Sequence, residues 1–204
     1  MKEIVKEMDT IVLASRNKHK IKELRETLSP LGIELKSTYD FPDLEEVIED
    51  ADTLEGNALK KARYVYNQTG LPALSDDTGL EVDALNGRPG VFSARYAGEN
   101  ATDQDNVDKL LEELSGIPME RRGAQFRTVA AFVTDDDSYT FEGICRGMII
   151  SEERGSGGFG YDPVFLPVAY KKTFAELDPG IKNKISHRGK AIQKFYEWLE
   201  NEKQ

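Results

Sequence analysis

The chain has 204 residues, of which 39% are hydrophobic and 31% charged, as is typical of a globular protein. This length suits one substantial domain or two closely packed lobes. The net charge of −10 and the lack of a basic run argue against a duplex DNA or RNA binder, whose affinity comes largely from phosphate neutralisation. No apolar stretch reaches the roughly 20 residues of a membrane helix, and the N-terminal residues lack a signal-peptide core. We therefore expect a cytoplasmic protein with no membrane or nucleic-acid partner.

Cysteine and histidine usage excludes two further classes of protein. Cys145 is the only cysteine, so an internal disulfide is impossible. With His19 and His187 as the only histidines, a Cys/His zinc cluster is excluded as well. Cys145 lies in a strand-like run, and we interpret it as a buried packing residue rather than a nucleophile.

The first part of the chain alternates between predicted strands and helices. The apolar residues 11–14 predict a buried strand, and the polar residues 15–20 predict a turn. Apolar residues then recur at spacings of three and four as far as Leu28, which indicates a helix, and residues 33–37 predict a second strand. This order of strand, helix and strand indicates an α/β fold.

The next predicted elements follow an acidic, irregular stretch at residues 40–52. Thr53 is a suitable N-cap for a helix that runs to about Thr69. Residues 73–75 predict a short strand, and the chain is expected to continue extended as far as Val82 after a polar interruption.

The remaining residues predict two helices and a hairpin. Residues 103–114 predict a helix, and residues 125–134 and 138–151 predict two long strands joined through an acidic turn. A glycine-rich loop at residues 155–160 comes next, and an amphipathic helix that carries Trp198 ends the chain. No repeat, low-complexity segment or linker divides the sequence.

The first candidate site is the polar stretch after the first strand, Ser15-Arg16-Asn17-Lys18-His19-Lys20. A helix N-terminus offers unpaired N–H groups and a favourable dipole to anions, and Asn17 and Lys20 add a side-chain donor and a positive charge. The stretch lacks the glycine spacing of a Walker A loop. It fits an anion site and, equally, a solvated helix cap with incidental lysines.

The second candidate is the acidic sequence Ser75-Asp76-Asp77-Thr78-Gly79-Leu80, at an expected strand end. Mg²⁺ is commonly held by one or two carboxylates together with substrate phosphates. The alternative interpretation is an Asx turn with Gly79 in a left-handed conformation. Glu49 is a further candidate ligand, although an acidic run of this kind is usually a solvated face.

The third candidate is the loop from Gly155 to Pro163, which contains the pattern G-x-G-x-x-G. A dinucleotide site needs that pattern at the start of a helix early in a βαβ unit, and a kinase needs HRD and DFG motifs, so neither interpretation fits. Phe159 and Tyr161 remain as candidates for stacking on a ligand that approaches the glycine backbone. A flexible hairpin loop is the alternative.

The fourth candidate combines Lys182 with Ile185-Ser186-His187-Arg188-Gly189 at the start of the last helix. An arginine donates two hydrogen bonds to O6 and N7 of a purine, so Arg188 is a candidate for base recognition. His187 fits either a ligand contact or a helix cap.

Six motifs in this order resemble the inosine triphosphate pyrophosphatase family. The resemblance covers residues 11–199 and rests on S-x-N-x-x-K at residues 15–20, TLEGNALKKA at 53–62, SDDTGL at 75–80, PGVFSARY at 89–96, GGFGYDP at 157–163 and ISHRG at 185–189. The resemblance implies an α/β fold with an elongated central mixed β-sheet flanked by helices, and two lobes with a nucleotide cleft between them. It implies one catalytic domain at residues 11–200, after an N-terminal extension at residues 1–10, and a homodimer.

The resemblance also implies roles for individual residues. Asp77 is the implied proton acceptor and, with Glu49, holds Mg²⁺. The sequence departs from the family around Glu49, so Asp50, Asp52 and Asp76 stay open as the second ligand. The phosphate-binding positions are Ser15, Arg16, Asn17, Lys18, His19, Lys20, Lys61 and Lys182. The other substrate-binding positions are Thr78, Phe159, Gly160, Tyr161, Asp162, His187 and Arg188.

The implied activity is hydrolysis of non-canonical purine nucleoside triphosphates, such as ITP, dITP and XTP, to the monophosphate and pyrophosphate. Selectivity is expected at purine C6, where a keto oxygen accepts hydrogen bonds from donors such as Arg188 and an adenine amino group does not. A Maf-like pyrophosphatase for other modified nucleotides and a non-catalytic nucleotide sensor are the alternatives. The presence of Asp77 and Lys20 argues against the sensor.

Overall fold

The computed structural model divides the chain into two compact units. It describes residues 8–135 and 137–203, and the side chains of His19 and Glu23 also lie outside this description. Unit 1 comprises Met1–Asp77, Val129–Glu142 and Ala191–Gln204. Unit 2 comprises Thr78–Thr128 and Gly143–Lys190.

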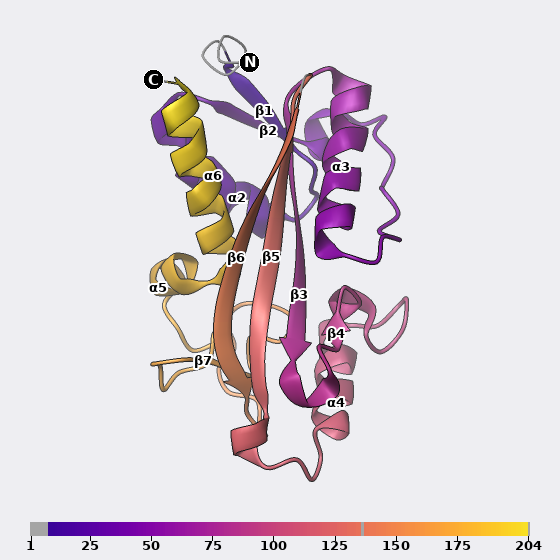
Figure 1. The fold of residues 1–204 in the computed structure, drawn as a ribbon, viewed down its shortest axis with the longest axis vertical. Helices are drawn as coiled ribbons and strands as arrows, with labels where there is room; N and C mark the ends of the chain where they lie inside the picture. The colour runs from indigo at the N-terminus through magenta and orange to yellow at the C-terminus, as the bar shows by residue number, and fades with distance from the viewer. Residues whose placement is uncertain (1–7, 136, 204) are drawn as a thin grey trace. The chain divides into compact units, whose positions relative to one another are not determined.

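Among the described residues, seven strands form one mixed β-sheet in the order β2-β1-β3-β5-β6-β7, with β4 paired to β3 (Figure 1). The strands are β1 (Thr10–Leu13), β2 (Glu34–Ser37), β3 (Ala73–Val82), β4 (Pro89–Gly90), β5 (Gly123–Val133), β6 (Ser138–Ile149) and β7 (Phe165–Pro167). β1 pairs in parallel with β2 and β3, whereas β4 and β7 pair antiparallel with β3 and β6. The α/β class with a mixed sheet is therefore confirmed.

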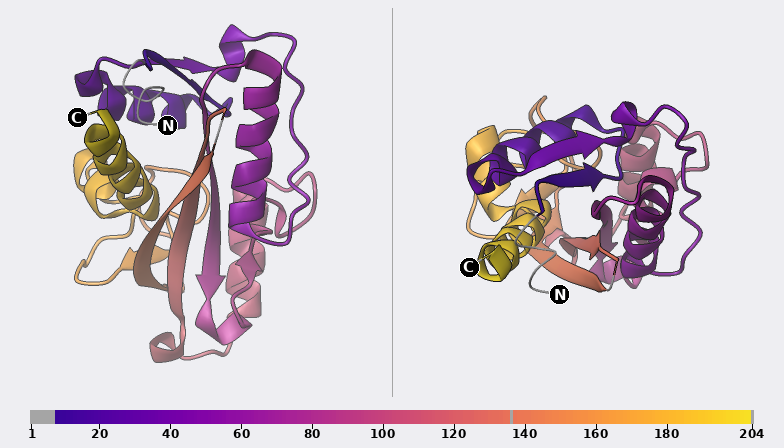
Figure 2. Two further views of the ribbon diagram at one scale, coloured as in Figure 1. Left: turned by 45° about the horizontal axis from the view of Figure 1, so that its top comes forward. Right: turned by 90° about the horizontal axis from the view of Figure 1, so that it is seen from above.

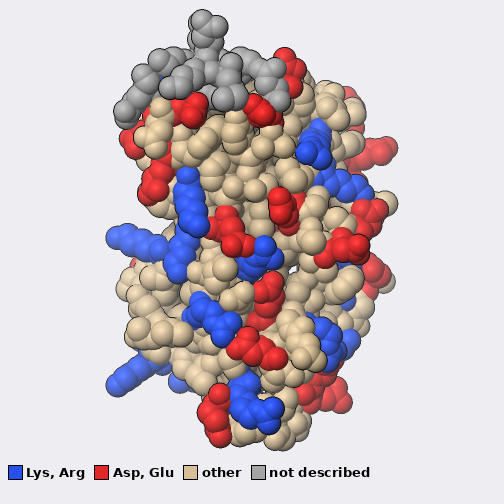
Figure 3. Space-filling model, in the orientation of Figure 1, with Lys and Arg blue, Asp and Glu red and all other residues tan. Residues whose placement is uncertain are grey.

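The helices account for most of the remaining regular structure. They are α2 (Lys18–Leu28), α3 (Leu54–Thr69), α4 (Asp103–Glu113), α5 (Pro179–Ile185) and α6 (His187–Lys203). In unit 1, α2 packs against β2 and α3 against β1, which the two views of Figure 2 show from different sides. None of the helices in the described part of the chain is long and apolar enough to cross a membrane. Acidic and basic side chains are interspersed on the face drawn in Figure 3.

The core of unit 1 is built from the apolar faces predicted by sequence periodicity. Leu24 and Leu28 of α2 and Phe195 of α6 are fully buried, together with Phe132 of β5. Met8 belongs to the same core. Of the expected N-terminal extension, residues 1–7 lie outside the described residues, Met8 is buried and Thr10 begins β1.

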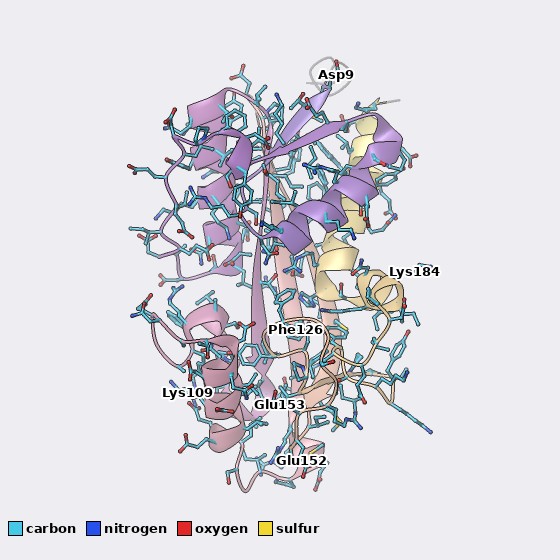
Figure 4. All side chains as sticks on the ribbon, turned by 180° about the vertical axis from the view of Figure 1, so that it is seen from behind. Asp9, Lys109, Phe126, Glu152, Glu153 and Lys184 are labelled. Atoms are coloured by element: carbon cyan, nitrogen blue, oxygen red, sulfur yellow. The ribbon has the colours of Figure 1, made fainter. Side chains whose placement is uncertain are left out.

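The core of unit 2 is rich in aromatic rings. Phe126 of β5, labelled in Figure 4, packs edge-on against Phe165 with ring centroids 4.7 Å apart. The imidazole of His187 stacks on the Phe126 ring, with centroids 4.5 Å apart. Cys145 is buried in this core, and burial raises the pKa of its thiol, so its interpretation as a packing residue is confirmed.

The structure corrects the predicted course of β3. The strand continues through Asp76 and Asp77 to Val82 without a turn, and Gly79 is not among the residues with positive φ. The turn interpretation of this sequence is therefore wrong. β4 explains the difference, because it pairs with β3 and brings the backbone of Gly90 so close that a Cβ on Gly79 would lie 2.5 Å from the Gly90 oxygen.

Two further differences concern short elements and a helix start. α2 begins at Lys18 rather than after Lys20, because the Asn17 side chain accepts a hydrogen bond from the Lys20 N–H at 3.2 Å and caps the helix. β7 and α5 were not predicted. Both are shorter than the stretch over which hydrophobic periodicity becomes visible.

Candidate functional site

The S-x-N-x-x-K loop borders a cavity of about 250 Å³ that lies within unit 1. Loop residues, α3 and β3 all contribute to its wall. The polar and charged residues that line it are Ser15, Arg16, Asn17, Lys20, Thr38, Glu45, Glu46, Glu49, Lys61, Tyr64 and Asp76. The loop, two lysines and two of the candidate acidic residues are thus brought together, although they are far apart in the sequence.

Hydrogen bonds from the segment after β2 hold the loop in place. Thr38 Oγ1 donates to the Ser15 carbonyl at 2.9 Å, and the Tyr39 hydroxyl donates to the Arg16 carbonyl at 3.0 Å. The Arg16 guanidinium donates in turn to the Leu44 carbonyl at 2.9 Å. These three bonds fix the loop in front of α2, and a helix N-terminus is where anions bind most readily.

The remaining loop residues differ in their exposure. Ser15 Oγ accepts a hydrogen bond from the Asn17 N–H at 3.1 Å, which closes the turn before α2. Lys18 is exposed, and the side chain of His19 lies outside the described part of the chain.

Two lysines and three carboxylates form a cluster at this cavity. Lys20 Nζ lies 2.7 Å from Asp76 Oδ2. Lys61 Nζ lies 2.6 Å from Glu49 Oε1 and 3.6 Å from Asp77 Oδ1, and it donates to the Asp76 carbonyl at 2.8 Å. With all five groups ionised, the three carboxylates leave one net negative charge on the cluster.

Burial and charge perturb the pKa values of this cluster in opposite ways. Burial raises the pKa of Asp77 to about 6, against the attraction of Lys61, and the charge of Glu49 adds to the rise. Burial acts to lower the pKa of Lys61, but the charges of Asp77, Glu49 and Asp76 outweigh it, so this pKa is raised. The cluster therefore keeps Lys61 charged and makes Asp77 an unusually weak acid.

A second group of candidate residues surrounds Phe159 in unit 2. The Phe159 ring is 44% exposed. Lys182 Nζ lies 5.1 Å and the Arg188 guanidinium carbon 5.6 Å from its centroid. Asp162 Oδ2 accepts hydrogen bonds from the Phe159 N–H at 2.9 Å and from Lys182 Nζ at 2.5 Å. The buried Asp162 carboxylate thus holds both the backbone of Phe159 and the ammonium group of Lys182.

Glycines are required where this arrangement is tightest. Gly158 has a φ of +76°, and a Cβ there would collide with the carboxylate of Asp162. A Cβ on Gly189 would collide with the Asn183 carbonyl, where α6 begins directly after α5. The two motifs therefore need glycine for close approach of the backbone.

Of the other residues predicted for the substrate site, Tyr161 and His187 lie in the interior of unit 2, whereas Thr78 and Gly160 are partly buried. Tyr161 is buried, and its hydroxyl donates to the Ser93 carbonyl at 2.8 Å, which places its ring in the core rather than on the surface. His187 is buried against Phe126. Thr78 Oγ1 lies 2.6 Å from Thr128 Oγ1, and the Gly160 N–H donates to Asp103 at 2.8 Å.

Residues 11–198 match the model of the Ham1 family. The chain belongs to the Ham1 family. A dITP/XTP pyrophosphatase of Desulforamulus reducens is 52% identical over 190 residues, which are 93% of this chain and 94% of that protein. A dITP/XTP pyrophosphatase of Geobacter sulfurreducens is 52% identical over 186 residues, which are 91% of this chain and 94% of that protein. The family resemblance carried by the six motifs is confirmed.

Solved structures agree with this assignment. A HAM1 protein from Coxiella burnetii superposes with a TM-score of 0.89 and 44% sequence identity, over 95% of this chain and 100% of that chain. A nucleoside-triphosphatase / dITP/XTP pyrophosphatase from Mycobacterium abscessus has a TM-score of 0.77 and 45% identity, over 91% of this chain and 97% of that chain. The fold of this Ham1-family chain is therefore that of its solved relatives.

The acidic residues of this Ham1-family chain fit Mg²⁺ as a pair rather than as a cage. Within residues 8–135 and 137–203, no group of three or more His, Cys, Asp or Glu is arranged to hold a metal. Glu49 and Asp77 both face one cation, the Lys61 ammonium. Mg²⁺ is commonly held by one or two carboxylates with substrate phosphates and water, so this pair has suitable donors. Asp50 is exposed and instead forms an ion pair with Lys60, in which Oδ1 lies 2.5 Å from Nζ.

One residue at the cluster was not predicted from the sequence. Asn57 of α3 is wholly buried, and its Nδ2 donates to Asp77 Oδ2 at 3.2 Å. The signal was present, because Asn57 shares the inward face of α3 with Leu54 and Ala58, where an apolar residue is expected.

Proposed function

We propose that this chain hydrolyses non-canonical purine nucleoside triphosphates, such as dITP, ITP and XTP, to the monophosphate and pyrophosphate. The observation that carries the proposal is the cluster of Lys20, Lys61 and three carboxylates beside a helix N-terminus in unit 1. The names of the relatives, dITP/XTP pyrophosphatases, support the same activity.

The charges of the cluster favour a metal-dependent reaction. The cluster carries one net negative charge, so a triphosphate by itself would be repelled despite Lys20 and Lys61. Mg²⁺ held by Glu49 and Asp77 would offset this repulsion and neutralise charge on the phosphates. Lys20, Lys61 and the N–H groups at the start of α2 bind the phosphate oxygens and stabilise the departing pyrophosphate.

Asp77 is the proposed proton acceptor. Water adds to the α-phosphorus, the bond to the bridging oxygen breaks, and pyrophosphate leaves with the nucleoside monophosphate as the second product. Asp77 orients this water and takes its proton, a role that suits its buried position beside Lys61. Asn57 and Lys61 fix the two oxygens of this carboxylate.

Base recognition is proposed for the Phe159 group of unit 2. The exposed ring of Phe159 offers a stacking surface, and Arg188 offers donors for the keto oxygen at purine C6. Adenine carries a donor at C6, which would leave the arginine donors without an acceptor. The homodimer implied by the family resemblance and the cytoplasmic location expected from the sequence are part of the same proposal.

Pyrophosphate release from a panel of nucleotides tests the proposal. The purified chain is incubated with ITP, dITP, XTP, GTP, ATP and modified pyrimidine triphosphates, with Mg²⁺ or with EDTA. We expect rapid pyrophosphate release from the first three with Mg²⁺ and none with EDTA. Binding without hydrolysis would indicate a sensor, and a preference for modified pyrimidines would indicate a Maf-like enzyme. Either result rejects the proposal.

A further inference from the structure

Asn57 connects two segments of the acidic cluster in unit 1. Its Nδ2 donates to Asp77 Oδ2 at 3.2 Å, and its Oδ1 accepts from the Ala51 N–H at 2.9 Å. The orientation of the amide follows from these partners, because a backbone N–H donates and therefore faces the oxygen. One wholly buried side chain thus contacts β3 and the segment that carries Glu49.

The segment that carries Glu49 has little regular structure to hold it. Residues 41–53, all of which are described, form neither helix nor strand. The Ala51 N–H bonded to Asn57 lies only two residues after Glu49. A second contact lies beside it, because a Cβ on Gly56 would lie 2.9 Å from the Ala51 Cβ, so the segment rests closely on the first turn of α3.

We propose that Asn57 is a positioning residue that sets the place of Glu49 relative to Asp77, and so tunes the site for a divalent cation. The inference rests on the proposed function, in which these two carboxylates hold Mg²⁺. An amide suits this position because it supplies one donor and one acceptor without adding a fourth carboxylate. Such partners of metal ligands orient the ligands without contacting the ion.

Unit 2 contains a matched residue whose side chain hydrogen-bonds to main-chain groups of the same unit. Asn106 is the fourth residue of α4, as Asn57 is of α3, and both helices have a threonine N-cap. Asn106 is also buried, with Oδ1 accepting from the Ala97 N–H at 2.8 Å and Nδ2 donating to the Ala94 carbonyl at 3.1 Å. Its two partners are main-chain groups. Replacing Asn106 therefore measures the loss of stability caused by removing a buried, hydrogen-bonded asparagine alone.

The test compares Asn57→Ala with Asn106→Ala in the full chain. Mn²⁺ binding is followed by electron paramagnetic resonance in the presence of an α,β-imido analogue of ITP that resists cleavage, below the unfolding temperature of both variants. We expect both variants to lose thermal stability, whereas only Asn57→Ala loses Mn²⁺ affinity, by about tenfold or more. Its activity should recover at high Mg²⁺, because Glu49 and Asp77 are still present.

A second variant keeps the test decisive if Asn57→Ala does not fold. Gly56→Ala favours the helix but displaces Ala51 from it, so we expect weaker Mn²⁺ binding with the fold retained. Mn²⁺ affinity equal to that of the wild type overturns the inference if it is found in a folded Asn57→Ala protein or, where that variant does not fold, in Gly56→Ala. Hydrolysis by the wild type tests the proposed function separately. If the wild type hydrolyses ITP but Asn57→Ala and Asn106→Ala bind Mn²⁺ with equal affinity, the inference is wrong and the proposed function stands.

Discussion

Units 1 and 2 each contain a lysine paired with a buried aspartate, in different surroundings. Lys20 Nζ lies 2.7 Å from Asp76, with side chains 17% and 2% exposed, and Lys182 Nζ lies 2.5 Å from Asp162, with side chains 17% and 4% exposed. Around the first pair lie further carboxylates and a second lysine. Around the second lie the rings of Phe159 and Phe174.

The difference shows that a buried ion pair does not itself indicate a function. Such a pair contributes little net stability, because the cost of desolvation offsets the attraction between the charges. In unit 1 the surplus of carboxylates suits a divalent cation, which can in turn bind phosphates. In unit 2 the pair holds the backbone and face of an aromatic ring, which suits a flat base. Changes in unit 1 should therefore affect all triphosphates alike, and changes in unit 2 should affect the choice among bases.

The largest effect is expected from Asp77→Asn. The variant keeps the shape of the side chain but cannot accept a proton, so kcat should fall by about 10²–10⁴-fold for ITP and ATP alike. Steady-state kinetics with both nucleotides, together with thermal unfolding to confirm the fold, measure this effect. Full activity in a folded Asp77→Asn protein would remove Asp77 from the mechanism.

The next effect distinguishes the two lysine–aspartate pairs. Lys20→Ala removes a charge-assisted contact worth roughly 1.5–3 kcal/mol, so binding of non-cleavable ITP should weaken by about 10–100-fold. Binding of the nucleoside inosine should not change. Calorimetric titration with both ligands measures the difference.

Lys182→Ala is the matched variant in unit 2. Because Lys182 lies against the Phe159 ring, we expect this variant to bind inosine and the ITP analogue more weakly, by similar factors in dissociation constant. A loss confined to the triphosphate would support the phosphate contact that the family resemblance implies for Lys182.

Arg188→Ala and Phe159→Ala should separate discrimination from stacking within unit 2. An arginine–purine contact discriminates between bases by roughly 1–3 kcal/mol, so Arg188→Ala should narrow the ITP-to-ATP ratio of kcat/KM by about 10–100-fold. Stacking has a similar strength but tolerates any base, so Phe159→Ala should lower both values equally. If the ITP-to-ATP ratio of kcat/KM in Arg188→Ala equals that of the wild type, other groups recognise the substituent at purine C6.

The smallest effect concerns stability at the end of β2, where Ser37 and Asp40 cap the short 3-10 helix Thr38–Asp40. Hydrogen bonds from Ser37 N–H and Oγ to Asp40, at 2.7 and 3.1 Å, hold the pKa of Asp40 below its ordinary value of 3.8. The ionised carboxylate therefore stabilises the fold above that pH, and this contribution is lost as the pH falls through the lowered pKa. Asp40→Asn should cost about 1 kcal/mol or less at pH 7, since the group is exposed.

Unfolding in urea at neutral and acidic pH measures the Asp40 effect. The difference in unfolding free energy between the wild type and Asp40→Asn should shrink as the pH falls below 3.8. Asp105 in unit 2 is held in the same way by Thr102, and Asp105→Asn should show the same direction of change. A gap that widens on acidification would contradict the assignment for either residue.

Local sequence signals predicted the longer elements well. α3 has a threonine cap, an apolar face and a terminal glycine, and the structure has the helix from Leu54 to Thr69, with Thr53 capping it and Gly70 in the left-handed conformation. β3 was harder, because Asp76 to Gly79 read as a turn by composition. The pairing of Leu80 with Gly90, beside the close approach of the Gly90 backbone to Gly79, keeps the strand extended, and that contact is not encoded in the local pattern.

For the site, the sequence by itself determined the family, the motifs and the residue types available to bind phosphate, metal and base. These follow from the order and spacing of residues along the chain, which can be seen directly in the sequence. Only the tertiary structure decided that Lys61 contacts Glu49 and Asp77, that Asn57 links Asp77 to Ala51, and that Tyr161 is buried. Such pairings and burial depend on how distant segments pack, because a side chain's partners and its access to water are properties of the folded chain.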